Sequence, residues 1–150
     1  MKIPERLETK RILLSPYPKE DVSKFLDSYR FMDPGFSLLM SNKLNDNYLG
    51  ICGLKPISES SSVGCVYALL SEFRGNGFAI EAMLKLIEYA FNMLEIPHII
   101  AYIHPENSKG WKVAERIGMK YMGQIKHKCF VHKTMLFTLD KKEYMIQHSY

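Results

Sequence analysis

Apolar positions follow two different repeat lengths along this chain, and the change of period separates predicted strands from predicted helices. Short apolar runs rich in β-branched and aromatic residues, bounded by Pro, Gly, Asn and Asp, are typical of strands. They predict strands at 11–15, 36–40, 48–54, 63–70, 99–103, 121–125 and 134–139. Apolar residues spaced three and four apart predict helices at 19–29, 79–94 and 108–117. We expect the helix at 79–94 to be largely buried, because it is apolar on most sides.

The order of these elements predicts one mixed α+β domain over residues 1–150. Residues 36–54 read as a hairpin, so the first half of the sheet should be antiparallel. The strand, long helix and strand at 63–103 form a βαβ unit, whose two strands should be parallel. No repeat, linker or low-complexity tract divides the chain.

Composition narrows the class of protein. The chain has 150 residues, 47% of them apolar, which suits one packed domain. Its net charge of +4 favours an anionic ligand but is too small to indicate nucleic acid. The N-terminus shows no secretory signal and no apolar run reaches the length of a membrane span, so we expect no membrane partner.

Cysteine usage indicates reduced thiols. Cys52, Cys65 and Cys129 are odd in number and far apart, without a CxxC pair, which predicts a cytoplasmic protein without disulfides. His127, Cys129 and His132 lie close together in sequence but lack the usual zinc spacing, so no metal is expected.

The segment 69–79 carries the clearest chemical signal. It joins a strand to the start of the long helix and contains Arg74, Gly75 and Gly77. Helix N-termini present free N–H groups and a positive dipole end, which together bind phosphate. Glycines let the backbone curl around an oxygen, although two glycines alone are also consistent with a plain tight turn. The chain has no G-x-x-x-x-G-K-[ST] motif, and Ile80 stands where a dinucleotide fingerprint needs Gly or Ala.

Several segments, in order and spacing, resemble the GNAT N-acetyltransferase superfamily and its RimJ/RimL-like branch. Residues 7–14 are similar to L-x-T-x-R-L-x-L and residues 48–54 to I-G-x-I-G-L. Residues 66–79 are similar to G-Y-x-L-x-P-E-x-R-G-K-G-Y-A, residues 105–107 read P-E-N, and residues 116–119 are similar to K-L-G-F. The resemblance covers nearly the whole chain.

The resemblance implies a twisted mixed sheet, largely antiparallel with one parallel pair and helices on both faces, which splays open after the strand at 63–70. It implies that acetyl-CoA binds as co-substrate, with its pantetheine arm paired to backbone groups of Leu69 and Leu70. An N–H near Leu70 would polarise the thioester carbonyl. The side chain of Asn107 would contact the cofactor from the far side. The pyrophosphate would bind N–H groups of Arg74, Gly75, Asn76, Gly77, Phe78 and Ala79.

The chain departs from the family pattern at the expected acid. Many relatives carry a tyrosine at the position of Ala114 and a serine at that of Gly110. Substitutes for the acid or base are Tyr67, His104 and Ser108. The purely structural alternatives are that Tyr67 is a core or rim residue, that His104 is a surface residue and that Ser108 caps a helix.

The acceptor side has a single predicted helix in 16–35 where relatives have two. A short lid would leave this side open to a protein N-terminus or a bulky amine, or a homodimer partner would complete it. Lys109, Lys112, Arg116 and Lys120 form a basic stripe that suits the 3′-phosphate of CoA or is simply solvated. The primary hypothesis is therefore an N-acetyltransferase acting on a primary amine. The alternatives are a catalytically weak acyl-CoA-binding protein and a nucleotide-binding module of another type.

Overall fold

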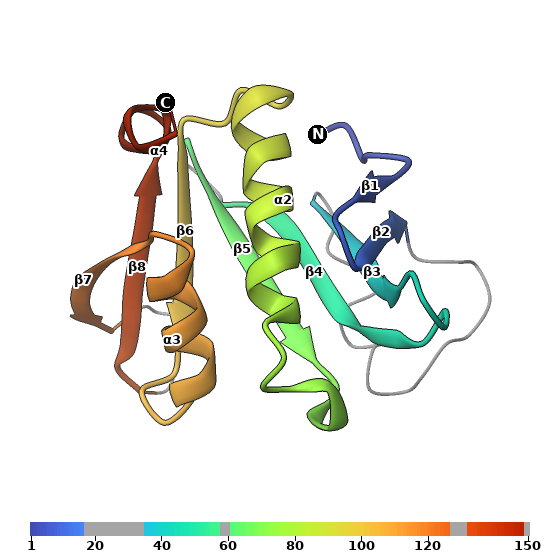
Figure 1. Cartoon of the computed structure of the whole chain (residues 1–150). Coiled ribbons are helices and arrows are strands. Elements are labelled where there is room, and N and C mark those ends of the chain that lie inside the picture. Colours follow the sequence, from blue (N-terminus) through green and yellow to red (C-terminus); the bar gives the residue numbers. More distant parts are fainter. Residues whose placement is uncertain (17–34, 58–60, 127–131, 149–150) are drawn as a thin grey trace.

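One sheet runs through the whole molecule (Figure 1). A computed structural model describes residues 1–16, 35–57, 61–126 and 132–148. The sheet has eight strands in the order β1-β2-β3-β4-β5-β6-β8-β7. In chain order the strands are Leu7–Glu8 (β1), Ile12–Pro16 (β2), Phe36–Asn42 (β3), Tyr48–Pro56 (β4), Ser62–Leu69 (β5), His98–Ile103 (β6), Lys120–Ile125 (β7) and Thr134–Asp140 (β8).

Neighbouring strands are antiparallel throughout this sheet, except for β5 and β6. These two are parallel because helix α2, Phe78–Asn92, carries the chain from the end of β5 back to the start of β6. The predicted α+β class, the antiparallel first half and the single parallel pair are confirmed.

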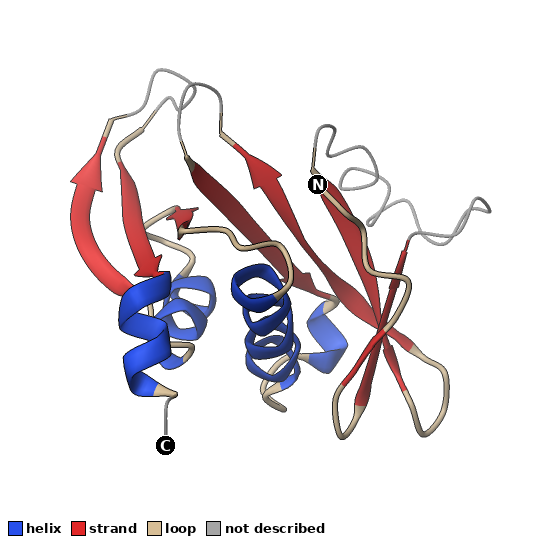
Figure 2. Cartoon of the chain, turned by 90° about the horizontal axis from the view of Figure 1, so that it is seen from above, coloured by secondary structure: helices blue, strands red, loops and turns tan. Residues whose placement is uncertain are grey.

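The described helices cover one face of the sheet (Figure 2). Besides α2 they are α3 (Ser108–Arg116) and α4 (Lys141–Gln147), and a short 3₁₀ turn, η1 (Ser71–Phe73), precedes α2. On the other face, Leu39 and Ile51 form a smaller buried cluster against which Val66 and Ala68 pack. The helix predicted over 19–29 lies outside the described residues. No described helix combines the length and apolar character that crossing a membrane requires.

Helix α2 lies at the centre of the helical layer and supplies much of the core. Its buried residues recur at helical spacing, as predicted, and are Phe78, Ala79, Ala82, Met83, Leu86, Ile87, Ala90 and Phe91. Fully burying one Leu or Ile side chain stabilises a fold by about 1.5–3 kcal/mol. This burial fixes α2 against the sheet, and with it the loop at the N-terminus of the helix.

The expectation that the chain finishes as strands was wrong, because α4 follows β8. The Asp140 side chain caps α4 by accepting a hydrogen bond from the Lys142 N–H at 2.8 Å. Tyr144, the buried residue of α4, packs on Phe91 with ring centroids 4.9 Å apart. Sequence reasoning missed α4 because a short helix with a single buried residue gives little periodicity, and its partner Phe91 is distant in sequence.

The sheet splits between β5 and β6. The parallel ladder joins only Ser62–Gly64 to His98–Ile100. Beyond Gly64, β5 stays paired with β4 as far as Leu69 opposite Gly50, whereas β6 stays paired with β8. Figure 1 shows the two strands diverging toward the loop before α2. The predicted splay therefore exists, and it begins inside β5 rather than after it.

Candidate functional site

The loop between β5 and α2 takes a conformation that requires glycine. Gly75 and Gly77 have φ angles of 87° and 77°, in the left-handed region that side chains disfavour. Gly77 is the N-cap of α2, and no side chain caps this end. A Cβ on Gly75 would meet nothing within 4 Å. The glycines are thus required by backbone conformation and not by crowding within the described protein.

This loop and the first residues of α2 carry a row of backbone N–H donors. Among the described residues, no hydrogen-bond acceptor is recorded for the N–H groups of Gly75, Asn76, Gly77, Phe78, Ala79 and Ile80. The first intrahelical bond at this end runs from the Glu81 N–H to the Gly77 carbonyl at 3.1 Å. Free N–H groups and the positive end of the helix dipole attract anions.

Arg74 differs from the rest of the predicted loop. Its N–H donates to the Ser71 carbonyl at 3.3 Å, so unlike its neighbours it is already engaged within the loop, and its binding to phosphate stays a prediction. The Asn76 side chain donates to the carbonyls of Phe73 and Arg74 at 3.3 and 3.4 Å. Asn76 therefore braces the loop with its side chain, while its N–H belongs to the row of donors.

This row of donors lies in the wall of an open cavity of about 500 Å³, between β5, the start of α2 and α3. The cavity is lined by Tyr67, Ala68, Leu69, Arg74, Gly75, Gly77, Phe78, Ala79, Ile80, Asn107, Lys109, Gly110, Lys112, Val113 and Arg116. No Asp or Glu occurs among these lining residues, whereas several are cationic. The cavity is thus suited to an elongated ligand that carries several negative charges.

The edge of β5 corrects one prediction about the backbone. The Leu70 N–H donates to the Leu49 carbonyl at 2.9 Å, so it is not available to a ligand. Backbone groups alternate sides along a strand, so the Leu69 N–H points to the opposite edge, where β6 has diverged. Leu69, and not Leu70, presents its N–H toward the opening. The sequence could not make this choice, because it does not reveal which edge each residue faces.

Tyr67 reaches across the opening. Its hydroxyl donates to the Gly110 carbonyl on α3 at 2.7 Å. Burial raises the pKa of Tyr67 above its ordinary value, and the neighbouring Cys65 acts in the same direction. The hydroxyl therefore keeps its proton near neutral pH, so it can donate a hydrogen bond and is no base, and the same shift makes it a weaker acid than an ordinary tyrosine.

Asn107 stands opposite the loop at the start of α3. Its Oδ1 accepts the Gly110 N–H at 3.0 Å, so Asn107 caps α3. Ser108, the cap considered from the sequence, is exposed and does not fill that role. A Cβ on Gly110 would lie 2.5 Å from Asn107 Nδ2, so a side chain there would displace the Asn107 side chain from this position. Gly118 follows α3 with φ of 95°, the left-handed conformation typical of a glycine after a helix.

His104 is placed away from the cavity. It is exposed, and its Nδ1 accepts the Glu106 N–H at 3.1 Å. Its ring lies edge-on to that of His132, with centroids 6.3 Å apart. Neither His104 nor Ser108 lines the cavity. His127 and Cys129 lie outside the described residues, and the described part of the chain holds no cluster of metal-ligating side chains.

The basic stripe divides in two. Lys109, Lys112 and Arg116 recur on one face of α3 and line the cavity, whereas Lys120 does not. Sequence reasoning missed the apolar lining residues Ile80 and Val113. Ile80 and Val113 follow Gly77 and Asn107 at helical spacing, which could have indicated that they line the cavity. The same spacing is typical of residues that pack in the core, so it does not separate the two roles.

Comparison with known proteins identifies the family. Residues 4–120 match the family described as acetyltransferase (GNAT) domain. An uncharacterized N-acetyltransferase of Bacillus licheniformis is 32% identical over 114 residues, which cover 73% of this chain and 63% of that protein. A putative ribosomal N-acetyltransferase of Bacillus subtilis is 29% identical over 100 residues, covering 64% of this chain and 54% of that protein. The chain thus covers less than two thirds of the length of either relative.

The fold itself also occurs in solved structures. An acetyltransferase (GNAT family) from Bacillus anthracis superposes with a TM-score of 0.76 at 18% identity, covering 91% of this chain and 99% of that one. At this identity the likeness shows the fold alone. It agrees with the splayed mixed sheet described above.

Proposed function

The chain belongs to the acetyltransferase (GNAT) domain family, and we propose that it transfers the acetyl group of acetyl-CoA to a primary amine. Domains of this family use acetyl-CoA as co-substrate. The proposal places the chain in the RimJ/RimL-like branch. It draws on the motifs at 7–14 and 66–79 and on the similarity to a putative ribosomal N-acetyltransferase.

The observation that carries this proposal is the row of N–H groups from Gly75 to Ile80 at the uncapped start of α2, for which no acceptor is recorded among the described residues. It fits the diphosphate of CoA in three respects. The glycines leave the backbone exposed, the helix dipole favours negative charge, and the cavity wall carries cationic side chains.

The remaining contacts follow from the shape of the cavity. The pantetheine arm would lie along the free edge of β5 and accept the Leu69 N–H. Asn107 Nδ2 would face it from α3, since Oδ1 is already used in the cap. Lys109, Lys112 and Arg116 would meet the 3′-phosphate, where their positive charges add to that of Arg74.

The reaction we propose is direct transfer. The amine nitrogen bonds to the thioester carbonyl carbon, the C–S bond breaks, the nitrogen loses a proton to water, and the thiolate takes up a proton. Of the candidates Tyr67, His104 and Ser108, the acid role goes to Tyr67, because it alone of the three lines the cavity. The Leu69 N–H would stabilise the charge that develops on the carbonyl oxygen.

The acceptor in this proposal is a protein N-terminus or a small amine. Residues 17–34, where the sequence predicts a short lid, lie outside the described part, so the acceptor side rests on the sequence alone. We further propose that residues 1–150 act as one domain in the cytoplasm, with a second copy of the chain as the candidate for completing the acceptor side. The buried free thiols Cys52 and Cys65 suit a reducing compartment.

The test is a CoA-binding titration followed by a CoA-release assay over peptides and small amines. Tight CoA binding with release in the presence of an amine supports the transferase. Binding without release for any amine favours the alternative, a catalytically weak acyl-CoA-binding protein. The Tyr67–Gly110 hydrogen bond gives this alternative some physical basis, since it already engages the acid. Preference for ATP or NAD over CoA would overturn both the transferase and the acyl-CoA-binding hypotheses, and would favour a nucleotide-binding module of another type.

A further inference from the structure

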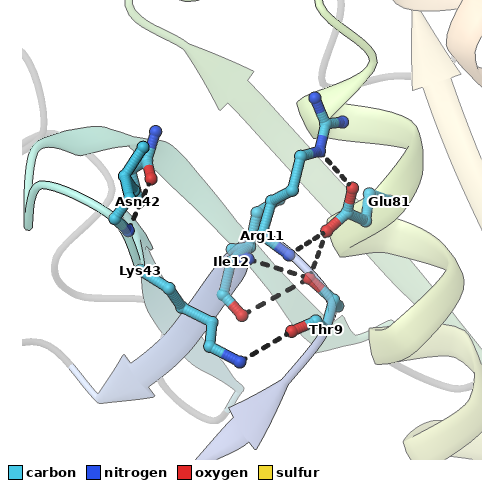
Figure 3. Close-up of polar contacts among 7 residues, drawn as sticks. Thr9, Arg11, Ile12, Asn42, Lys43 and Glu81 are labelled. Atoms are coloured by element: carbon cyan, nitrogen blue, oxygen red, sulfur yellow. Dashed lines mark hydrogen bonds and ion pairs between the residues drawn. The ribbon is translucent and has the colours of Figure 1, made fainter.

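The turn between β1 and β2 is joined to the first turns of α2 by polar contacts that converge on one carboxylate (Figure 3). The Thr9 hydroxyl donates to Glu81 Oε2. The Arg11 N–H donates to the same oxygen at 2.9 Å, and Arg11 Nε donates to Oε1 at 2.7 Å. The Glu81 carboxylate thus accepts bonds from a turn that precedes it by about 70 residues.

The guanidinium of Arg11 lies beside the residues that open α2. Its central carbon is 4.4 Å from the ring centroid of Phe78, the first residue of the helix. Its Nη2 lies 3.6 Å from the position that a Cβ on Gly77 would take. Glu81 uses Nε, and within the described residues no acceptor is recorded for the Nη atoms. Arg11 is absent from the cavity lining, so its charge lies beside the lining residues Gly77 and Phe78 and not in the lining itself.

The turn that carries Arg11 is itself fixed. Lys43, which follows β3, donates its N–H to the Arg11 carbonyl at 2.9 Å and its Nζ to the Thr9 carbonyl at 3.1 Å. The Thr9 hydroxyl also accepts the Ile12 N–H at 3.0 Å. A guanidinium held from a braced turn loses little freedom when a ligand arrives, so its charge is already in position.

The contacts of Glu81 determine its charge, and Arg11 balances that charge. Partial burial raises the pKa of Glu81, but hydrogen bonds from Thr9 and from Arg11 outweigh burial and hold the pKa below its ordinary value. Glu81 is therefore an anion at neutral pH, in the first turn of the helix whose N-terminus must attract an anion. Arg11 neutralises this charge where it would otherwise repel a diphosphate.

We propose that Arg11 is a positioning residue for the diphosphate of CoA, acting through the Gly77–Phe78 segment that it contacts. It holds this segment so that the N–H groups face the cavity, and it cancels the charge of Glu81. The inference rests on the proposed function above, because both concern the same loop. The β1–β2 turn, none of whose residues lines the cavity, would then control affinity for the phosphates alone.

The test compares CoA with pantetheine, which lacks the diphosphate and adenosine. In titrations, Arg11→Gln should raise the Kd of CoA about tenfold, while the Kd of pantetheine stays within about twofold. Arg11→Lys keeps the charge but loses the Nε hydrogen bond to Glu81 and the guanidinium contact with the Phe78 ring, so it should raise the Kd of CoA about threefold. The double variant Glu81→Gln/Arg11→Gln should have a Kd for CoA no higher than that of Arg11→Gln alone, because both changes remove the same contact.

Lys85→Gln is the matched control, since Lys85 pairs with Glu88 at 3.6 Å one turn further along the same helix. It should leave both Kd values unchanged. Thermal unfolding of each variant shows that it is folded, and Arg11→Lys carries the test if Arg11→Gln does not fold. The inference would be overturned if the Arg11 variant that carries the test lost affinity for CoA and pantetheine equally. It would also be overturned if the Kd of CoA for that variant stayed within twofold of wild type. Failure of the wild-type chain to bind CoA would instead overturn the proposed function.

Discussion

The two walls of the cavity are built in different ways. The wall from β5 to α2 presents backbone N–H groups whose directions are set by left-handed glycines and by a helix buried in the core. The α3 wall presents the exposed side chains of Lys109, Lys112 and Arg116. Backbone donors cost no side-chain entropy when a ligand binds, whereas long side chains must be ordered. Affinity for CoA should therefore fall sharply when the conformation of the first wall changes. It should fall in small steps as single charges are removed from the second wall.

The largest effect should come from Gly77→Val. A β-branched residue at φ of 77° is strained by about 1–2 kcal/mol or changes the backbone, and either outcome turns the N–H groups away. We expect the Kd of CoA to rise at least tenfold in a titration, with a smaller effect on thermal unfolding. Gly64→Ala is the control, because its φ is not in the left-handed region and the added Cβ meets the Lys55 carbonyl oxygen at an ordinary 3.5 Å. Equal CoA affinity in wild type and Gly77→Val would refute the loop assignment.

Tyr67 bridges the two walls, so its removal should separate chemistry from binding. Tyr67→Phe deletes the hydroxyl that donates to the Gly110 carbonyl while keeping the ring. Loss of a general acid lowers rates by roughly 100-fold or more, so kcat should fall by about that factor. KM for acetyl-CoA should stay within about twofold. Tyr121→Phe on β7, where the ring is exposed and outside the cavity, should change neither constant. A rise in KM with unchanged kcat would make Tyr67 a structural link between the walls and not the acid.

The α3 wall should respond in small, charge-dependent steps. Replacing Lys109, Lys112 or Arg116 by Ala should each raise the Kd of CoA by about two- to fivefold, because exposed charge contacts contribute about 0.2–1 kcal/mol. The effect should shrink at high salt and with dephospho-CoA, which lacks the 3′-phosphate. Lys120→Ala is the internal control, since Lys120 continues the stripe in sequence but does not line the cavity. Weakening by Lys120→Ala that equals the others would show that general charge, and not the wall, attracts the ligand.

The smallest effect concerns pH and the carboxylate behind the first wall. The pKa of Glu81 is lowered in the folded state, so ionised Glu81 contributes stability above the ordinary Glu pKa of about 4.3. This contribution is lost as pH falls through the lower, folded-state pKa. The difference in unfolding midpoint between wild type and Glu81→Gln should therefore shrink at acidic pH, below about pH 4. A difference that stays constant from neutral to acidic pH would contradict the assigned direction of the shift.

Much of the fold could be predicted from local pattern. The long helix, the βαβ unit and the glycines of the loop are all expressed in short windows of sequence, because period, turn chemistry and backbone conformation are local properties. Gly75 and Gly77 were predicted to let the backbone curl around a ligand oxygen, and each has a positive φ. The family resemblance supplied the splay of the sheet, which periodicity alone does not encode.

Other parts of the site depend on which segments meet. The choice between the N–H groups of Leu69 and Leu70 depends on the partner of β5 at each edge. The exclusion of His104 from the cavity depends on where β6 ends relative to α3. Helix α4 needed Phe91 as its packing partner.

The sequence by itself therefore determined the loop that opens α2, since two glycines and a buried helix specify its backbone from within. Only the tertiary structure decided what surrounds the loop: the Tyr67 hydroxyl against Gly110, the cationic face of α3, and Arg11 bound to Glu81. The physical reason is range. Backbone conformation is set by neighbours along the chain, whereas hydrogen bonds and charges act between groups that only the packing of the sheet and helices brings within a few ångströms.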